Sequence, residues 1–292
     1  MIATKLRVMD LQPRDGVFNT AFDLFLLKEA EQGKFTLGFT KWLPSVVIGS
    51  SQSLALDVNL EECRRRGISV VRRFSGGQAV FLDENYIVWT LAGERKIFPN
   101  DLDVLREQMC QAVIRALRQI NIPAEFFPPD NLVVSNPHIK TLGNSGQVIK
   151  RDVIAISASV RYELSESSLR QMLTCLKTNG KSLVDFFEPA KRYLASIKEF
   201  TRVSPDLVKE LIIKEIATTY GCDSWFSTAL SQEDYEEVSQ FVNSVIARLE
   251  DRPIYVSRGV CYFFLGGRCI VPEISEFLPL NKPSTVLDST II

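Results

Sequence analysis

The sequence is poor in residues on which several common chemistries depend. It has a single histidine in 292 residues, His138, and that residue stands in a turn-like stretch with no nucleophile motif nearby. Catalytic triads of the Ser-His-Asp or Cys-His kind are therefore not expected. The six cysteines include no Cys-x-x-Cys pair, so a structural zinc site is not expected either. Any catalysis by this chain should rely on backbone amides, lysine and arginine.

Excess charge and long apolar runs are also lacking. The chain has 34 basic and 35 acidic residues and a formal net charge of −1, so no long-range field favours nucleic acid or an anionic membrane as a partner. No stretch of about 18 apolar residues could span a bilayer. The N-terminal residues 1–7 lack the apolar core of a signal peptide. We therefore expect a cytoplasmic protein with reduced cysteines.

Hydrophobic patterning is what the chain does have, with 46% hydrophobic residues. Period and turn signals predict an α/β fold. Asn19 is the expected N-cap of the first helix, and a hairpin is expected to join strands 78–82 and 86–92. The predicted helices are 20–32, 60–66, 102–119, 167–175, 205–220 and 232–249, and the predicted strands are 6–11, 35–42, 45–49, 68–74, 78–82, 86–92, 124–127, 132–135, 140–142 and 153–162.

The chain divides into two parts of unequal size. Residues 1–250 read as one domain with a sizeable core. After Asp251-Arg252-Pro253 the pattern changes to short apolar segments around glycines. Residues 251–292 are therefore predicted to form a small C-terminal β extension.

The most informative segment runs from Val71 to Phe81 and contains Arg72, Arg73 and the bend Ser75-Gly76-Gly77. Two adjacent glycines allow backbone N–H groups to face a ligand and bind an anion or a carbonyl oxygen. An arginine beside them can hold a phosphate or carboxylate. Because neighbouring strand residues face opposite sides, only one of the two arginines should reach such a ligand. A plain hairpin turn is the alternative.

A second polar segment runs from Lys140 to Gln147 and is predicted to be a turn between strands. A lysine fixed there can bind a carbonyl and a phosphate and stabilise developing charge. The alternative is a solvated loop lysine.

Taken together, these segments resemble the lipoate-protein ligase A and octanoyl/lipoyl transferase family, which is related to biotin protein ligases. The resemblance covers about residues 1 to 248. Four segments carry it, namely Asp15–Leu27, Trp42 with Val46–Gln52, Gly67–Phe81, and Lys140–Gln147 with its Lys-x-x-Gly pattern.

The resemblance implies a biotin/lipoate protein ligase-like α/β (α+β) fold, with mixed, mostly antiparallel sheets flanked by helices. It also implies an enzyme that attaches lipoate, or a similar medium-chain acyl group, to a lysine through an acyl-adenylate. ATP and Mg²⁺ would be its cofactors and lipoate its substrate. A lipoyl domain or glycine-cleavage H-type protein would be the acceptor, with a separate accessory chain as a further partner. The catalytic residue would be Lys140, meeting the glycine bend in space. Substrate would be bound by Arg72, Arg73, Ser75, Gly76, Gly77, Gln78, Ala79, Gln52, Gly143, Asn144 and Ser145.

The sequence departs from the family pattern at several positions. Gln78 replaces the third glycine, Leu82 replaces a histidine, and Asp130-Asn131 stands where Asn-Asp is common. The usual His-Gly-Thr strand reads Ser157-Ala158-Ser159. Two alternatives therefore stay open: an octanoyl or lipoyl transferase that passes the acyl group between carrier proteins, and a degenerate acyl-binding accessory protein. No cysteine lies between Cys110 and Cys175 to serve as a transferase nucleophile, which favours the ligase.

Overall fold

The structure is a computed structural model that describes residues 4–135, 138–150, 152–178 and 180–249, with the short pairs 264–265 and 268–269. A mixed eight-stranded sheet forms its centre, in the order β13-β1-β2-β6-β10-β9-β8-β7. β1 runs parallel to both of its neighbours, and the remaining pairs are antiparallel. The strands are β1 (Thr4–Asp10), β2 (Thr36–Thr40), β6 (Tyr86–Glu94), β7 (Ala124–Phe127), β8 (Asn131–Ser135), β9 (Ile139–Lys150), β10 (Val153–Arg161) and β13 (Cys222–Thr228).

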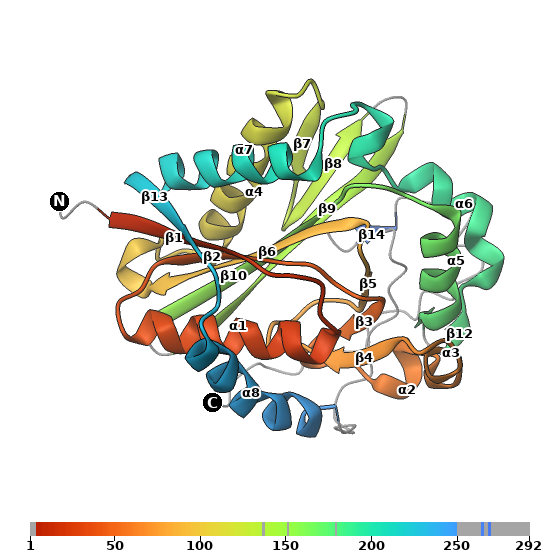
Figure 1. The fold of residues 1–292 in the computed structure, drawn as a ribbon. Helices are drawn as coiled ribbons and strands as arrows, with labels where there is room; N and C mark the ends of the chain where they lie inside the picture. Colours follow the sequence, from red (N-terminus) through yellow and green to blue (C-terminus); the bar gives the residue numbers. More distant parts are fainter. Residues whose placement is uncertain are drawn as a thin grey trace, which may run out of the picture.

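Helices cover both faces of this sheet (Figure 1). α4 (Leu102–Arg118) and α7 (Pro205–Thr219) pack on one face, and α1 (Gly16–Glu31) packs on the other with α8 (Gln232–Ala247) outside it. Both faces of the central strands are therefore buried in apolar layers, since β10 alternates between Ile154 and Ile156 on the α4 side and Val153 and Ala155 on the α1 side.

A second, three-stranded sheet carries the segment with the two arginines. Its order is β4-β3-β5, with β3 parallel to β4 and antiparallel to β5. The strands are β3 (Ser45–Ile48), β4 (Ser69–Arg72) and β5 (Val80–Leu82). One face joins the α1 core, and the other forms a separate cluster with α3 (Leu60–Arg66) and α5 (Glu166–Cys175). The small sheet thus stands between two cores, at one end of the large sheet in Figure 1.

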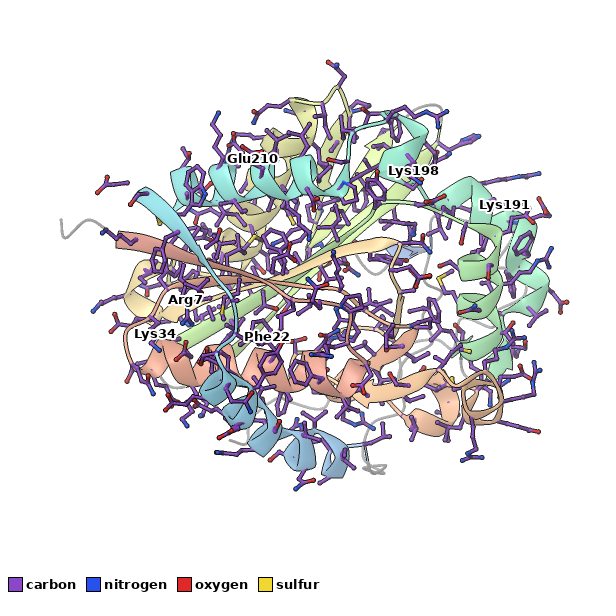
Figure 2. All side chains as sticks on the ribbon, viewed as in Figure 1. Arg7, Phe22, Lys34, Lys191, Lys198 and Glu210 are labelled. Carbon is purple, nitrogen blue, oxygen red and sulfur yellow. The ribbon has the colours of Figure 1, made fainter. Side chains whose placement is uncertain are left out.

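Ion pairs join side chains from different elements. Glu29 forms ion pairs with both Arg7 and Lys34, and Figure 2 shows these two cations at the same end of the large sheet.

Several short elements connect the longer ones. They are α2 (Leu54–Asp57), α6 (Phe187–Tyr193), the pair β11 (Lys177–Thr178) and β12 (Lys181–Ser182), and the 3-10 helices Arg95–Ile97, Val184–Phe186 and Ile197–Glu199.

Three sequence expectations about local structure are wrong. α1 begins at Gly16, because the carboxylate of Asp15 accepts the N–H of Phe18; Asn19 is buried inside the helix and donates to backbone carbonyls. The segments 78–82 and 86–92 do not form a hairpin, because β5 and β6 belong to different sheets. The predicted turn from Lys140 to Gln147 lies within β9, which continues to Lys150.

The predicted C-terminal extension falls almost wholly outside the described residues. Within it the structure describes only β14 (Phe264–Leu265) and β15 (Arg268–Cys269), which pair in antiparallel fashion. The division at residue 250 stays a prediction.

Candidate functional site

The Ser75-Gly76-Gly77 bend connects β4 to β5 and exposes both of its glycines. Gly77 has a φ of +87°, a conformation that glycine adopts without strain. The carbonyl oxygen of Gly77 would lie 1.9 Å from a Cβ atom on Gly49, so the preceding loop can approach only because Gly49 has no side chain. No heavy atom lies within 4 Å of the Cβ position of Gly76, where the bend is open. The bend is therefore an exposed backbone cradle, a kind of feature that can bind an anion.

Arg73 holds this bend in shape. Its Nε donates to the hydroxyl of Ser75 at 3.0 Å, and its Nη2 donates at 2.7 Å to the carbonyls of Gly76 and Gln78. Its Nη1 reaches back to the carbonyl of Val47 at 3.0 Å. The guanidinium thus lies directly against the bend, where it adds positive charge beside the exposed glycines.

Arg72 points the other way, as strand alternation requires. It is only 3% exposed and donates to the carbonyls of Gly49 and Gln52 at 3.1 and 2.7 Å. Its Nε also donates to the carbonyl of Arg248, at the end of α8, at 2.9 Å. The prediction that one arginine only would reach the bend is confirmed, and that arginine is Arg73. Arg72 instead ties the 49–52 loop to α8.

Gln52 and Ala79 do not line a common surface. Gln52 is buried, accepts the N–H of Gly49 at 2.9 Å and donates to the side chain of Gln78 at 3.2 Å. Ala79 is fully buried in the cluster with α3 and α5. Because strand residues alternate, Val80 and Leu82 are the side chains of β5 that pack on the α1 side.

The bend meets β9 at Gly146. The hydroxyl oxygen of Ser75 would lie 3.6 Å from a Cβ atom on Gly146, which is ordinary contact distance. Asn144, two residues earlier, accepts a hydrogen bond from Ser159 of β10 at 3.2 Å on the same face. Ser145 points to the opposite face, where its hydroxyl lies 3.8 Å from the thiol of Cys110 in α4. Of the three predicted residues in this stretch, only Asn144 faces the bend with its side chain.

Gly143 marks a bulge in β9. The pairing with β8 skips one residue between Gly143 and Thr141. A Cβ atom at Gly143 would lie 2.1 Å from the carbonyl oxygen of Ser159, so only glycine fits. The role of Gly143 is therefore to let two strands approach closely, which a Lys-x-x-Gly pattern by itself does not reveal.

Lys140 lies beyond this bulge, and its ammonium is 3.0 Å from the carboxylate of Glu199. It is paired with Val134, whose side chain belongs to the α4 and α7 core, and cross-strand partners share a face. Six residues of extended strand place its backbone about 20 Å from that of Gly146. The structure thus does not bring Lys140 to the bend, contrary to the expectation.

Asp130 is an acidic residue near the bend. Its backbone carbonyl accepts the N–H of Ser145 at 2.9 Å. Burial raises the pKa of its carboxyl, and this effect outweighs the opposing influence of Arg106 and Arg73. Asp130 is thus a half-buried carboxyl within the electrostatic reach of the arginine that shapes the bend.

Sequence reasoning missed a buried polar cluster on the α1 side. Asp23 of α1 accepts a hydrogen bond from Thr90 of β6 at 2.7 Å, and Thr90 lies 2.8 Å from the hydroxyl of Ser157 of β10. Burial raises the pKa of Asp23 to about 7, with Thr90 lowering it in part. The sequence did contain one signal for this cluster. Asp23 is a polar residue on the inner face of α1, which is otherwise lined by Phe22, Phe25 and Leu26.

The described cysteines are not placed as nucleophiles at the bend. Burial raises the pKa of Cys110 to about 12, so its reactive thiolate is scarce at neutral pH. Cys63 and Cys175 are buried together in the cluster behind the small sheet, where a hydrogen bond with Cys175 and burial raise the pKa of Cys63. Burial also raises the pKa of Cys222 to about 11, on the edge strand β13.

Two features are absent from the described part of the chain. Across these residues, no group of three or more His, Cys, Asp or Glu side chains is arranged to hold a metal ion. None of the described helices has the length and apolar character needed to cross a membrane.

Similar proteins of known sequence are lipoate ligases and octanoyltransferases. A probable lipoate-protein ligase A from Mycoplasma genitalium is 29% identical over 188 residues, covering 63% of this chain and 53% of the relative. Octanoyltransferase LipM from Moorella thermoacetica is 31% identical, covering 43% of this chain and 48% of the relative. The chain thus spans about half the length of these relatives.

Solved structures show the same fold. The bi-partite lipoate protein ligase of Thermoplasma acidophilum, described with its E2 lipoyl domain, has a TM-score of 0.74 at 17% identity and covers 87% of this chain and all (100%) of its own. A lipoate-protein ligase A bound with ATP has a TM-score of 0.68 at 17% identity, covering 83% and 95%. These likenesses confirm the predicted fold class.

The sequence also matches the family profile described as the lipoyl protein ligase A/B catalytic domain, over residues 15–217. That region contains the glycine bend, β9 and the Asp23 cluster. The chain belongs to the lipoyl protein ligase A/B catalytic-domain family.

Proposed function

We propose that this protein is an ATP-dependent ligase that activates lipoate, or a similar medium-chain acid, and transfers it to a lysine of a lipoyl domain. The observation that carries the proposal is the exposed glycine cradle, held by Arg73 and resting on Gly146 of β9, within this family's fold. Such a cradle suits the phosphate of an acyl-adenylate, because backbone N–H groups and a guanidinium both favour an anion.

The residues at the bend suit the phosphates of ATP better than they suit a metal ion bound only by protein side chains. The open position beside Gly76 leaves room for a phosphate. Mg²⁺ commonly binds through one or two carboxylates together with substrate phosphates, and Asp130 offers one carboxylate near Arg73. Asp130 would therefore hold a magnesium ion carried by the nucleotide, and that ion would neutralise charge on the phosphates.

Lys140 is assigned to catalysis by its match to the Lys-x-x-Gly pattern, as the cation that would bind the acyl carbonyl. Because six residues of β9 separate Lys140 from Gly146 at the bend, about 20 Å of extended strand, the assignment requires that its ammonium leave Glu199 and that this part of β9 approach the bend. Because both side chains of this ion pair are partly exposed, at 25% and 35%, breaking the pair should cost no more than about 1 kcal/mol. Gln78, Asn144 and Ser75 would complete the surface around the acyl group.

The acceptor would be a lipoyl domain, or a glycine-cleavage H-type protein of the same kind. Support comes from the structural relative described as a bi-partite ligase with its E2 lipoyl domain. The bi-partite composition of that relative also supports a separate accessory chain as a second partner.

A transferase that moves octanoyl or lipoyl groups between carriers is the second candidate. The similarity to octanoyltransferase LipM favours it. The burial of Cys110, Cys63 and Cys175 argues against a thioester route through any of these three thiols.

The test is to incubate the protein with ATP, Mg²⁺, lipoate and an apo lipoyl domain, and to measure the mass of the domain. We expect the mass of a lipoyl group to be added, in an ATP-dependent reaction. Modification from an octanoyl-carrier donor without ATP, together with none from lipoate and ATP, would reject the ligase in favour of the transferase. No modification from either donor, with lipoate still bound, would identify a degenerate acyl-binding protein.

A further inference from the structure

Cys63 and Cys175 lie next to each other behind the small sheet, although they are far apart in the sequence. Cys63 belongs to α3 and Cys175 ends α5, and both are free thiols, at most 1% exposed, in the same apolar cluster. Asn59 connects their backbones, because its carbonyl accepts the N–H of Cys63 at 3.0 Å and its N–H donates to the carbonyl of Cys175 at 2.8 Å. The two thiols are also hydrogen-bonded to each other. The junction of α3 and α5 therefore holds two reduced sulfur atoms in contact.

The two thiols differ in acidity. Cys63 donates its proton to the sulfur of Cys175, and this hydrogen bond lowers the pKa of Cys175 against the opposing effect of burial. The nearby positive charges of Arg66 and Arg65 add to this lowering, although Glu62 acts the other way. The pKa of Cys63 is raised by the same hydrogen bond and by burial. Since the thiolate is the reactive form of cysteine, Cys175 is the thiol that an oxidant would attack first, and Cys63 is placed to react with the product.

A small oxidant can reach this pair through a local opening of α3. This helix has only seven residues, and the three that follow Cys63 are exposed arginines. All seven residues are described, and Cys63 alone among them is buried. Segments with few buried side chains open locally at a small free-energy cost. Burial in the folded state therefore slows the oxidation of the pair without preventing it.

The pair lies between the bend and the strand that carries Lys140. α3 leads through Gly67 into β4, and Arg73 and the bend follow directly. The chain after α5 returns to β9, where Leu194 pairs with Thr141, the neighbour of Lys140. Leu194 also packs into the same apolar cluster as the two cysteines. A covalent bond between α3 and α5 would therefore restrain movement of the small sheet relative to the part of the chain that is attached to β9.

We propose that Cys63 and Cys175 form a redox-sensitive clamp, a disulfide that joins α3 to α5 in the presence of hydrogen peroxide and slows acyl transfer until it is reduced. The Cys175 thiolate attacks one oxygen of the peroxide, the O–O bond breaks, and the departing hydroxide takes up the proton that Cys175 had released. This step leaves a sulfenic acid on Cys175. The sulfur of Cys63 then attacks the sulfur of Cys175, its proton passes to the leaving hydroxyl group, and water departs as the S–S bond forms. Two thiols and one peroxide thus give one disulfide and two molecules of water.

The bond and its effect on transfer are separate consequences. The effect on transfer rests on the proposed function, in which the part of β9 around Lys140 must approach the bend. The bond itself does not depend on that function. A disulfide from residue 63 to residue 175 would close a long loop, and long loops restrict the unfolded chain most strongly. Resistance to unfolding therefore reports the bond independently of any transfer.

The experiment treats the full-length reduced protein with hydrogen peroxide, removes the peroxide with catalase, and measures intact mass and proteolytic peptides without reductant. We expect the loss of two hydrogen atoms per molecule and a peptide pair that joins Cys63 to Cys175. The urea midpoint of unfolding should rise by about 1 M. Lipoyl transfer from lipoate and ATP should fall by at least about fivefold, as expected for a coupled conformational restraint. Treatment with dithiothreitol, removed before the assay, should reverse both changes.

Three variants test the assignment to this pair. In Cys63→Ala and in Cys175→Ala, peroxide should change neither the urea midpoint nor the rate of transfer, because one sulfur is missing. Cys110→Ala is the matched control, since it removes another buried thiol, which lies against Ser145 in α4. It should keep the full response to peroxide.

Several results would overturn the clamp. They are the absence of a disulfide after treatment, a disulfide between other cysteines, a Cys63–Cys175 bond that leaves transfer unchanged, and a loss of transfer that persists in both alanine variants of the pair. If the reduced protein transfers no lipoyl group, the proposed function fails together with the effect on transfer, whereas the bond is still decided by the mass and the urea midpoint. The unaltered protein decides alone if an alanine variant does not fold.

Discussion

At the scale of single residues, the ion pair between Lys140 and Glu199 has the largest consequence for the proposed chemistry. Glu199 uses one carboxylate oxygen to accept the N–H of Ser196 at 2.9 Å and the other to hold Lys140 at 3.0 Å. The carboxylate is thus fixed by the chain that precedes α7, while Lys140 has a flexible stem. If the lysine acts on substrate, Glu199 competes with the substrate for it.

Variants of these two residues should therefore have opposite effects. Lys140→Ala should lower lipoyl transfer by at least about 100-fold, as loss of a charge-stabilising donor does elsewhere, with little change in the free energy of unfolding. Glu199→Gln frees the ammonium while keeping a hydrogen-bond acceptor for Ser196, and should lower the KM for lipoate or leave it unchanged. Steady-state transfer assays and urea denaturation check both variants. Normal turnover in Lys140→Ala would remove this lysine from the mechanism.

Cys110 provides a second residue-scale prediction. Its thiol is buried in α4 against Ser145, and burial raises its pKa to about 12. Cys110→Ser should therefore keep ATP-dependent transfer within about threefold of the unaltered protein, at a stability cost of about 1 to 3 kcal/mol for the buried hydroxyl. Mass spectrometry after incubation with an octanoyl-carrier donor should show no acyl group on Cys110. An acyl-thioester at this residue would instead establish the transferase.

At the scale of elements, β4, the bend and β5 show what sequence patterns determine and what they omit. Alternation along β4 correctly predicted that Arg72 and Arg73 face opposite sides. It could not predict the pairing of β5, because a turn at Asp83-Glu84-Asn85 fits a hairpin and a change of sheet equally well. The bulge at Gly143 was hidden for a similar reason, since its cause is the carbonyl of Ser159 on a neighbouring strand.

Most helices follow closely from local signals. Their ends carry ordinary capping residues, with Ser204 before α7, Ser231 before α8 and Gly67 after α3. These ends depend on hydrogen bonds within a few residues. Tertiary contacts such as the Asp23 to Thr90 bond join residues far apart in the chain, and no local pattern specifies them.

The two glycines of the bend should respond differently to alanine. Gly77 has a φ of +87°, and its Cβ position lies 2.9 Å from Nη2 of Arg73, so Gly77→Ala should lower the free energy of unfolding by about 1 to 2 kcal/mol. Gly76 has no heavy atom within 4 Å, so Gly76→Ala should leave stability nearly unchanged. Its methyl group would nevertheless fill the proposed phosphate cradle and raise the KM for ATP. Gly76→Ala with normal kinetics would place the nucleotide elsewhere.

At the scale of the whole molecule, the fold places the polar cluster and the bend on the α1 side of the large sheet. The large sheet is apolar on the α4 side. On the α1 side, Thr90, Ser157 and Gly146 lie side by side on neighbouring strands. Asp23 contacts Thr90 at one end of this row, and Ser75 contacts Gly146 at the other. A carboxyl placed between a helix and the centre of a sheet should be visible in the stability of the entire fold.

The pH dependence of unfolding should reveal this carboxyl. Its pKa rises from 3.8 to about 7 on folding, so the folded state binds a proton more tightly than the unfolded state does. Its contribution to stability is therefore fully present below about pH 4, is lost as the pH rises towards about 7, and changes by at most about 4 kcal/mol. Asp23→Asn cannot ionise, so its stability relative to the unaltered protein should increase over that interval.

Urea denaturation of both proteins at several pH values between about 4 and 8 measures this difference, because contributions from all other groups cancel in the comparison. Asp185→Asn is the matched control, since it makes the same replacement at an exposed position. A difference between Asp23→Asn and the unaltered protein that stays constant with pH would mean that Asp23 ionises as freely as it does in the unfolded chain. The carboxyl would then be well hydrated in the folded protein.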